Sequence, residues 1–290
     1  QREKAEGLRS QAEAALAVGD LEAAGARIAE LDRLPGGTSV GSSDLRKRYE
    51  AKAGERETNK RYAAASVARE EVKCPVAGEA WTSPATDMEF VWVTALKLWV
   101  GKYDVTNGEY RKKDAGHDSK DYQGHTLNSD RQPVVEVNFD DAKAYAEWLT
   151  GQDRERLGGL RYRVVSEAEW QACAQCGDGR EYPWGNAMPP KYGNYSDSAS
   201  PLSVKIAGYT DGFAVTCPVE RSGVNEWGLY GLGGNMWEGC ASDASGGSFG
   251  AWRGASWNDG NPDCIRCAFR LGLDGSTRGH GLGFRLVLSR

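Results

Sequence analysis

The cysteines are the residues whose spacing most plainly suggests chemistry. Four of the seven form two pairs with two residues between the partners, Cys173 with Cys176 and Cys264 with Cys267. This is the spacing of a zinc knuckle, so the two pairs could together hold one metal ion. Neither pair has the glycine-rich knuckle that orients zinc thiolates, and the first pair ends a predicted amphipathic helix. We therefore expect small buried hydrophobic residues rather than a zinc site.

The histidines and carboxylates form no recognisable catalytic arrangement. His117 and His125 lie in a polar stretch that is typical of solvated surface, and His280 is the only other histidine. The sequence has no phosphate-binding Gly-Lys-Ser and no H-E-x-x-H. The adjacent Asp140 and Asp141 begin a predicted helix, where they favour its dipole.

Composition excludes two classes of partner. The chain has 290 residues, 40% of them hydrophobic, which is ample for a buried core. A formal net charge of −5 offers no basic stripe for phosphates, so we expect no nucleic-acid partner. No run of eighteen apolar residues is present, so we expect no membrane insertion in this segment. The chain begins with Gln1, and we expect a processed or truncated product from which the targeting segment is absent.

Residues 1–73 have a helical composition, rich in Ala, Glu, Arg and Lys. Gly19 and Asp20 break two helices, Pro35-Gly36-Gly37 closes a helical hairpin, and a third helix is expected from about Leu45 to Ala65. The segment is either a stalk or oligomerisation arm, or a helical cap on the main domain. One helix face carries Leu21, Ala24, Ile28, Leu31 and Leu34.

Residues 74–290 are predicted to form a separate domain of short strands and long loops. Periodic helix is limited to residues 140–150 and 166–176, and the second begins with a capping box made by Ser166 and Glu169. Residues 177–290 are rich in turn-forming glycine, asparagine and aspartate, with aromatic residues between them. Loops of this length need their own packing, aromatic plugs or metal ions to become ordered.

Seven segments of this domain resemble, in the same order, motifs of the formylglycine-generating-enzyme (sulfatase-modifying factor) family. The resemblance implies an α+β domain with the C-type lectin fold of that family: irregular and loop-rich, with a small twisted antiparallel sheet and two flanking helices. The segments are GKYDVTNGEY at 101–110, QPVV with DDA at 132–142, RVVSEAEW at 163–170, YPWGN at 182–186, GLYGLGGNMWE at 228–238, RGASW at 253–257 and LGFRL at 282–286.

The resemblance implies calcium as a structural cofactor, because loops rich in carbonyl oxygens suit a hard cation. The residues that match the family's first calcium site are Asn194, Tyr195, Asp211 and Phe213. Those that match its second site are Gly231, Gly234, Met236 and Glu238, where Gly231 replaces a side-chain ligand of the family.

The family's oxidase holds copper with two cysteines, and this chain keeps only one of them. Asp259 stands at the first position and Cys264 at the second. A cuprous ion prefers two soft thiolates, and one carboxylate in place of a sulfur removes most of the affinity. We therefore expect neither copper nor iron and no enzymatic activity.

Residues 248–290 also resemble the variable region of proteins diversified by retroelements, a group within this fold. Error-prone copying of template adenines in AAY codons cannot produce Lys, Glu, Gln, Met or Trp. The segment contains none of the first four, and its two tryptophans, Trp252 and Trp257, lie in or beside a framework motif. Framework arginines, expected to bond backbone carbonyls, would separate exposed, exchangeable positions. The positions expected to vary are Asn258, Asp259, Gly260, Ile265, Phe269, Leu271, Gly272, Leu273, Asp274, Ser276, Thr277, Gly279, His280 and Gly281.

The sequence thus predicts a non-catalytic, receptor-like or adhesin-like protein at the cell surface or secreted. Its C-terminal loops would bind a protein or a cell-surface ligand, and its N-terminal helices could oligomerise. A binding or sensor domain of fixed specificity and a divergent oxidase remain the alternatives.

Overall fold

The chain divides into two compact units, Gln1–Val72 and Lys73–Arg290, at the change in composition. The turn expected at Pro35-Gly36-Gly37 lies outside the described residues. None of the described helices is long and apolar enough to cross a membrane. The computed structural model describes residues 2–34, 42–69 and 74–290.

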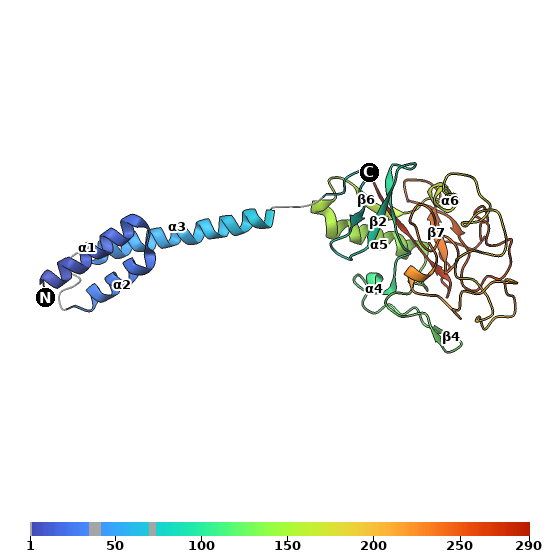
Figure 1. Cartoon of the computed structure of the whole chain (residues 1–290), viewed down its shortest axis with the longest axis horizontal. Coiled ribbons are helices and arrows are strands. Elements are labelled where there is room, and N and C mark those ends of the chain that lie inside the picture. The colour runs from blue at the N-terminus through green and yellow to red at the C-terminus, as the bar shows by residue number, and fades with distance from the viewer. Residues whose placement is uncertain (1, 35–41, 70–73) are drawn as a thin grey trace. The chain divides into compact units, whose positions relative to one another are not determined.

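The first unit is helical, with α1 (Arg2–Val18), α2 (Leu21–Asp32) and α3 (Ser42–Arg69), which is longer than expected (Figure 1). Gly19, whose φ of +79° favours glycine, ends α1. The Asp20 carboxylate accepts a hydrogen bond from the Ala23 amide at 3.0 Å and so caps α2. The apolar faces of the helices bury Ala5, Leu8, Ala12, Leu16, Ala24, Ile28, Leu31 and Leu45.

The second unit is built on a five-stranded antiparallel sheet with the strand order β1-β2-β3-β10-β6. The last strand of the chain lies inside this sheet, because β10 pairs with β3 on one side and with β6 on the other. The strands are β1 (Trp81–Thr82), β2 (Glu89–Val93), β3 (Leu98–Gly101), β6 (Arg161–Val164) and β10 (Leu286–Ser289).

Alternation along β10 shows how the sheet separates two parts of the core. Leu286 and Leu288 join the cluster that contains Tyr145 and Leu149 of α5 (Phe139–Asp153). Val287 joins the cluster that contains Trp170 of α6 (Glu167–Gln175). Successive side chains of a strand point to opposite faces, so α5 covers one face and α6 the other. The two expected flanking helices are confirmed.

The helices begin at caps that the sequence specifies. Ser166 and Glu169 form the expected capping box at α6, and Asn138 with Asp141 forms another at α5. The short α4 (Asn107–Tyr110) is capped in the same way by Thr106 and Glu109. The 3-10 turns are η2 (Arg154–Arg156) and η3 (Val219–Arg221).

A three-stranded sheet and a hairpin lie among the loops (Figure 1). In the order β8-β7-β9, β7 (Trp237–Ala241) pairs antiparallel with β8 (Phe249–Arg253) and parallel with β9 (Leu282–Gly283). The hairpin is formed by β4 (Asp121–Tyr122) and β5 (His125–Thr126). Aromatic residues plug the loops, as expected, with Trp237, Trp252, Tyr195 and Trp184 in one cluster.

Candidate ligand-binding surface

The C-terminal loops form one excursion whose two ends are fixed in neighbouring strands. Residues 254–281 leave from the end of β8 and return at the start of β9. Both strands pair with β7, where Glu238 lies opposite Arg253 on one side and Gly283 on the other. A loop with both ends held in a sheet has less conformational freedom to lose when it is ordered.

Three arginines clamp this excursion to carboxylates elsewhere in the domain. Arg266 lies 2.7 Å from Glu181, Arg270 lies 2.7 Å from Glu167, and Arg278 pairs with Asp141. The sequence predicts backbone carbonyls as the hydrogen-bond partners of these arginines. Such carbonyl contacts are present, as between Arg278 Nη1 and Glu136 O at 2.9 Å, and the ion pairs add to them.

Arg253 adds a buried anchor from the framework. Its Nη2 donates to the carbonyl of Cys267 at 2.7 Å and to Gln171 Oε1 at 2.9 Å, and its guanidinium lies over the ring of Trp170. The side chain is 2% exposed, so these bonds are shielded from water. Arg253 therefore ties the excursion to α6.

Not all positions expected to vary are exposed. Ile265 is 1% exposed and packs in the cluster of Trp237 and Trp252. Gly260 is buried, and a Cβ there would lie 2.3 Å from the carbonyl oxygen of Val204. Gly281 is buried against Ser256. The expectation of exposure is therefore wrong for these three positions, because they are packed against other segments.

Asp259 is also turned inward. Its carboxylate accepts hydrogen bonds from the amide and the hydroxyl of Ser256, at 2.9 and 2.8 Å. It therefore caps its own turn, although burial raises its pKa. Of the other expected positions, the exposed ones are Asn258, Gly272, Leu273, Asp274 and Ser276, and the half-buried ones are Phe269, Leu271, Thr277, Gly279 and His280.

The β4–β5 hairpin borders this surface. The sequence did not predict this contact. The ring of Tyr122 packs edge-on against Trp257 at 5.0 Å and against His280 at 5.5 Å between ring centroids. His280 in turn lies 2.9 Å from the carboxylate of Glu136. The available signal was the Gln123-Gly124 turn between two short polar runs.

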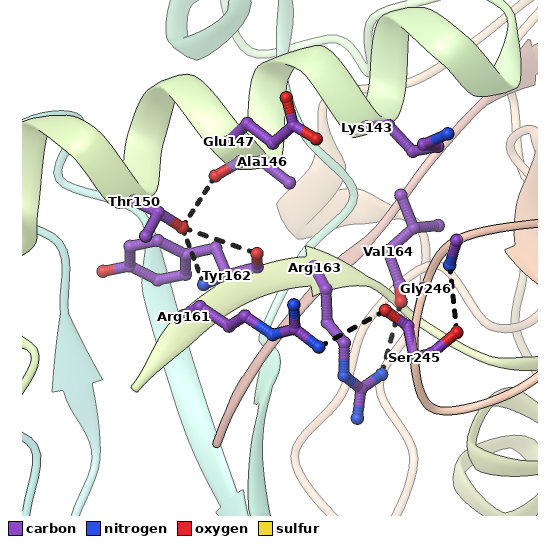
Figure 2. Close-up of a pocket in the computed structure, with 11 residues that line it drawn as sticks. Lys143, Ala146, Glu147, Thr150, Arg161, Tyr162, Arg163, Val164, Ser245 and Gly246 are labelled. Carbon is purple, nitrogen blue, oxygen red and sulfur yellow. Dashed lines mark hydrogen bonds between the residues drawn. The ribbon is translucent and has the colours of Figure 1, made fainter. Parts of the chain in front are cut away.

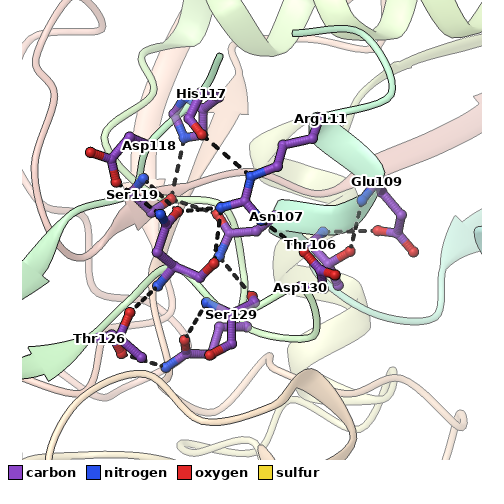
Figure 3. A network of polar contacts seen from close by, with 12 residues as sticks. Thr106, Asn107, Glu109, Arg111, His117, Asp118, Ser119, Thr126, Ser129 and Asp130 are labelled. Carbon is purple, nitrogen blue, oxygen red and sulfur yellow. Dashed lines mark hydrogen bonds and ion pairs between the residues drawn. The ribbon is translucent and has the colours of Figure 1, made fainter. Parts of the chain in front are cut away.

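A polar network holds the base of that hairpin (Figure 3). Asn107 Nδ2 donates to the carbonyls of Leu127 and Ser129 at 2.8 and 3.0 Å, and Ser119 Oγ donates to Asn107 Oδ1 at 2.6 Å. His117 Nε2 lies 3.0 Å from the carbonyl of Val135. His117 is half-buried and burial lowers its pKa, so the reading of residues 117–125 as solvated surface is wrong at this residue.

The residues that match the family's first calcium site lie together and fit a cation. Asn194 is fully buried, and its Oδ1 has no hydrogen-bond partner while its Nδ2 donates to Val215 O and Asn235 Oδ1. The carboxylate of Asp211 accepts from the amides of Tyr195 and Phe213, each at 2.9 Å. Unpaired buried oxygens are uncommon in proteins and suit a hard cation.

The electrostatics of this loop also favour a cation. Burial raises the pKa of Asp211 to about 6, with a further contribution from the charge of Asp197. Asp197, which the sequence analysis did not select, accepts from the amides of Asp211 and Gly212 at 2.6 and 3.2 Å. No group of three acidic, histidine or cysteine ligands occurs among the described residues. The fit here comes from one carboxylate, one amide oxygen and backbone carbonyls.

The residues that match the second calcium site do not fit a calcium ion. Both carboxylate oxygens of Glu238 bind the guanidinium of Arg285 at 2.9 Å, and Arg285 Nη2 lies 2.6 Å from Asp104 Oδ1. All three side chains are 0% exposed. A Cβ at Gly231 would lie 2.5 Å from Asp104 Oδ2, so no ligand side chain fits there. The cation of this cluster is an arginine. Gly234 lies against Asn194 instead, and Met236 is buried in a hydrophobic cluster with Val135 and Trp257.

The cysteines that could do redox chemistry differ in burial and in their neighbours. Cys264 is half-buried, and burial raises its pKa, with the charges of Asp259 and Asp263 acting in the same direction. A raised pKa disfavours the thiolate that binds metals. Cys173 and Cys267 are buried in one hydrophobic cluster, as expected, whereas Cys176 is only half-buried and its Sγ lies 3.4 Å from Glu226.

A cavity of about 450 Å³ lies between α5 and β6, outside the C-terminal excursion (Figure 2). Lys143 and Glu147 of α5 and Arg161 of β6 line it, together with residues 245–247. Arg163 also lines it, but its charge is balanced by Glu169 at 2.7 Å. None of the motif residues that match the family's calcium or copper positions lies in this cavity.

Comparison with known proteins places the chain in a family. The family model described as "Sulfatase-modifying factor enzyme 1-like domain" matches residues 51–290. The chain belongs to this family. The recognised motifs and the α+β fold with its curled antiparallel sheet are thereby confirmed.

Curated relatives of this sulfatase-modifying-factor-like chain include both enzymes and proteins named inactive. It is 31% identical over 182 residues to a formylglycine-generating enzyme of Thermomonospora curvata, covering 62% of this chain and 50% of the relative. It is 35% identical over 161 residues to the "Inactive C-alpha-formylglycine-generating enzyme 2" of Bos taurus, covering 53% and 49%. The chain thus spans about half the length of the curated relatives it matches.

A solved structure shares the fold of this family member. Treponema denticola variable protein 1 has a TM-score of 0.55 and 17% sequence identity, over 73% of this chain and 99% of that protein. At this identity the likeness shows the fold alone.

Replacing Arg285 with glutamine should lower the free energy of unfolding of the domain more than the substitution of an exposed charged residue does. The variant leaves Glu238 and Asp104 as buried carboxylates without a cation, which costs about 3–5 kcal/mol. The free energy of unfolding, measured with urea, should fall by that amount. Lys112→Gln, which removes an exposed ion pair with Asp87, is the control and should cost less than about 1 kcal/mol. Equal effects of the two substitutions would contradict the assignment.

Proposed function

We propose that the C-terminal excursion of this domain is a non-catalytic binding surface for a protein or a cell-surface ligand, and that its exposed residues are diversified by a retroelement. The observation that carries the proposal is the alternation of clamped and exposed residues. Arg266, Arg270 and Arg278 are fixed by carboxylates outside the excursion, while Asn258 and residues 272–276 lie between or beside these clamps, largely exposed. Such a framework tolerates exchange of the exposed side chains.

The surface has the mixed chemistry of a protein interface. Phe269 and Leu271 are half-buried beside exposed Leu273, and Asn258 and Ser276 offer polar groups. Aromatic and apolar residues next to hydrogen-bonding groups are typical of protein-binding patches. The inactive relatives and the fold of Treponema denticola variable protein 1 support a binding role. Such a protein would act at the cell surface or outside the cell, with the helices of the first unit as a spacer or oligomerisation arm.

Natural sequence variation tests diversification. We expect differences among natural copies of this gene to concentrate at Asn258, Gly272, Leu273, Asp274 and Ser276, because these side chains meet solvent. The arginine clamps, together with Asp259, Gly260 and Ile265, should stay constant because they are packed or paired. The measurement is deep sequencing of the 3′ end of the gene, with a search nearby for a near-copy repeat and a reverse transcriptase. Invariance at the exposed positions, with no repeat, would favour a domain of fixed specificity.

The divergent oxidase is the second candidate, supported by the catalytic relatives. Because Asp259 caps its own turn and Cys264 has a raised pKa, we expect no tight cuprous-ion binding and no oxygen consumption with a cysteine peptide. Competition with a chromogenic cuprous chelator measures the first and an oxygen electrode the second. Cys264→Ser should match the wild type in both assays. Oxygen uptake that disappears in Cys264→Ser would favour the oxidase over the binding protein.

Calcium at the first site is part of the proposal. Asn194 Oδ1, a carboxylate oxygen of Asp211 and the carbonyls of Tyr195 and Phe213 would hold the ion, and no described residue donates a hydrogen bond to either carbonyl. Calcium at about 100 times its dissociation constant should stabilise the wild type by about 2.7 kcal/mol. Thermal unfolding with calcium and with a chelator measures this difference. Asp211→Asn should lose it, whereas Asp140→Asn, at an exposed helix start, should keep it.

A further inference from the structure

The loop that carries the proposed calcium ligands also supports one turn of the proposed binding surface. The backbone amide of Ser196 donates to the carbonyl of Asp259 at 3.1 Å. Gly260 packs so closely on Val204 that a Cβ would lie 2.3 Å from the carbonyl oxygen of Val204. Ser196 itself is fixed to that residue, because its Oγ donates to the same carbonyl at 2.6 Å. The outer side of the 256–260 turn therefore rests on the 194–213 loop.

A second route reaches the same turn from the inner side. The amide of Asn235 donates to the carbonyl of Asn194 at 2.8 Å, and the amide of Trp257 donates to the carbonyl of Asn235 at 3.2 Å. The side chains reinforce this chain of bonds, because Asn194 Nδ2 donates to Asn235 Oδ1 at 3.0 Å. The turn is thus bonded on both sides to residues that flank the calcium position.

The rest of the excursion is held differently. Residues 266–281 are fixed by the Arg266, Arg270 and Arg278 ion pairs, and the return into the sheet is fixed by Arg285. None of these ion pairs involves the 194–213 loop, whose Tyr195 and Ile206 meet the rest of the excursion in the hydrophobic cluster that includes Phe269 and Leu271. At Arg285, where the family would place a second calcium ion, the guanidinium is part of the chain and no chelator can remove it.

We propose that calcium bound at Asn194 and Asp211 sets the position of the 256–260 turn, and so regulates ligand contact by Asn258, while residues 266–281 stay in place. The inference rests on the calcium site and the binding surface proposed above. The physical cause of this dependence on calcium lies at the site itself. The cation compensates the unpaired Asn194 Oδ1 and the buried Asp211 carboxylate, and without it these two buried groups of the 194–213 loop are left uncompensated.

Hydrogen exchange of the full chain, followed by mass spectrometry in calcium and in a chelator, tests the inference without any ligand. At about 100 times the calcium dissociation constant, amides whose opening releases the ion should exchange about 100-fold more slowly than in the chelator. We expect this change for Tyr195, Phe213 and Trp257. The amide of Leu271, bonded to the carbonyl of Trp252 at 3.0 Å, should exchange at the same rate in both conditions.

Two glycine substitutions separate the turn from the calcium loop. Gly260→Ala would clash with the Val204 backbone, so the variant should bind calcium but exchange the Trp257 amide rapidly in both conditions. Gly272→Ala is the matched control in the same excursion, because a Cβ there meets nothing within 4 Å. It should respond to calcium as the wild type does. Calcium binding itself is followed by isothermal titration.

The outcomes distinguish the three proposals. Absence of calcium binding would overturn the calcium site and this inference together. Calcium binding that protects Tyr195 and Phe213 but leaves Trp257 unchanged would overturn the inference and keep the site. A calcium effect of equal size at Leu271 would also overturn it, because the regulation would not be confined to the turn. None of these results depends on whether residues 258–276 bind a ligand.

Discussion

The ion cluster around Arg285 is the interaction on which the second unit depends most. Its guanidinium donates to Glu238, Asp104, the carbonyl of Gly101 and the carbonyl of Tyr230, with distances of 2.6 to 2.9 Å. These partners belong to β7, to the end of β3 and the segment after it, and to the loop before β7. Burial raises the pKa of Asp104, so the cluster is costly to form. That cost is offset because one side chain fixes both sheets where the chain returns from its long excursion.

The excursion is held by charge rather than by secondary structure. Strands β8 and β9 fix its ends, and Arg266, Arg270 and Arg278 fix its middle on acidic residues of other segments. The paired carboxylates are 19–40% exposed, so each exposed pair alone contributes little stability. Their value lies in geometry, because a planar guanidinium fork fixes direction as well as distance. Arginine is therefore a suitable residue for placing loops whose other side chains are exposed.

The sequence was informative where local chemistry decides the structure. The Ser166–Glu169 capping box and the two helices follow from short-range patterns, and the motif order led to the fold. The buried or exposed state of loop residues did not follow, because it depends on segments far away in the sequence. Ile265 is buried by Trp237 and Trp252, and Gly260 by Val204. The contact of Tyr122 with Trp257 and His280 was missed for the same reason.

The two ways of holding the excursion have different consequences for exchangeable residues. An arginine clamp uses a side chain at both ends, so its neighbours can change without weakening it. The 256–260 turn is instead bonded to other loops through the main chain, from Ser196 to Asp259 and from Trp257 to Asn235. Within the turn, the Asp259 carboxylate accepts from the amide and the hydroxyl of Ser256. Gly260 is sterically restricted there, and Trp257 is packed in a hydrophobic cluster with Met236. Asn258 is exposed and accepts a hydrogen bond from Ser256 Oγ, while the position of its backbone depends on the loop beneath it.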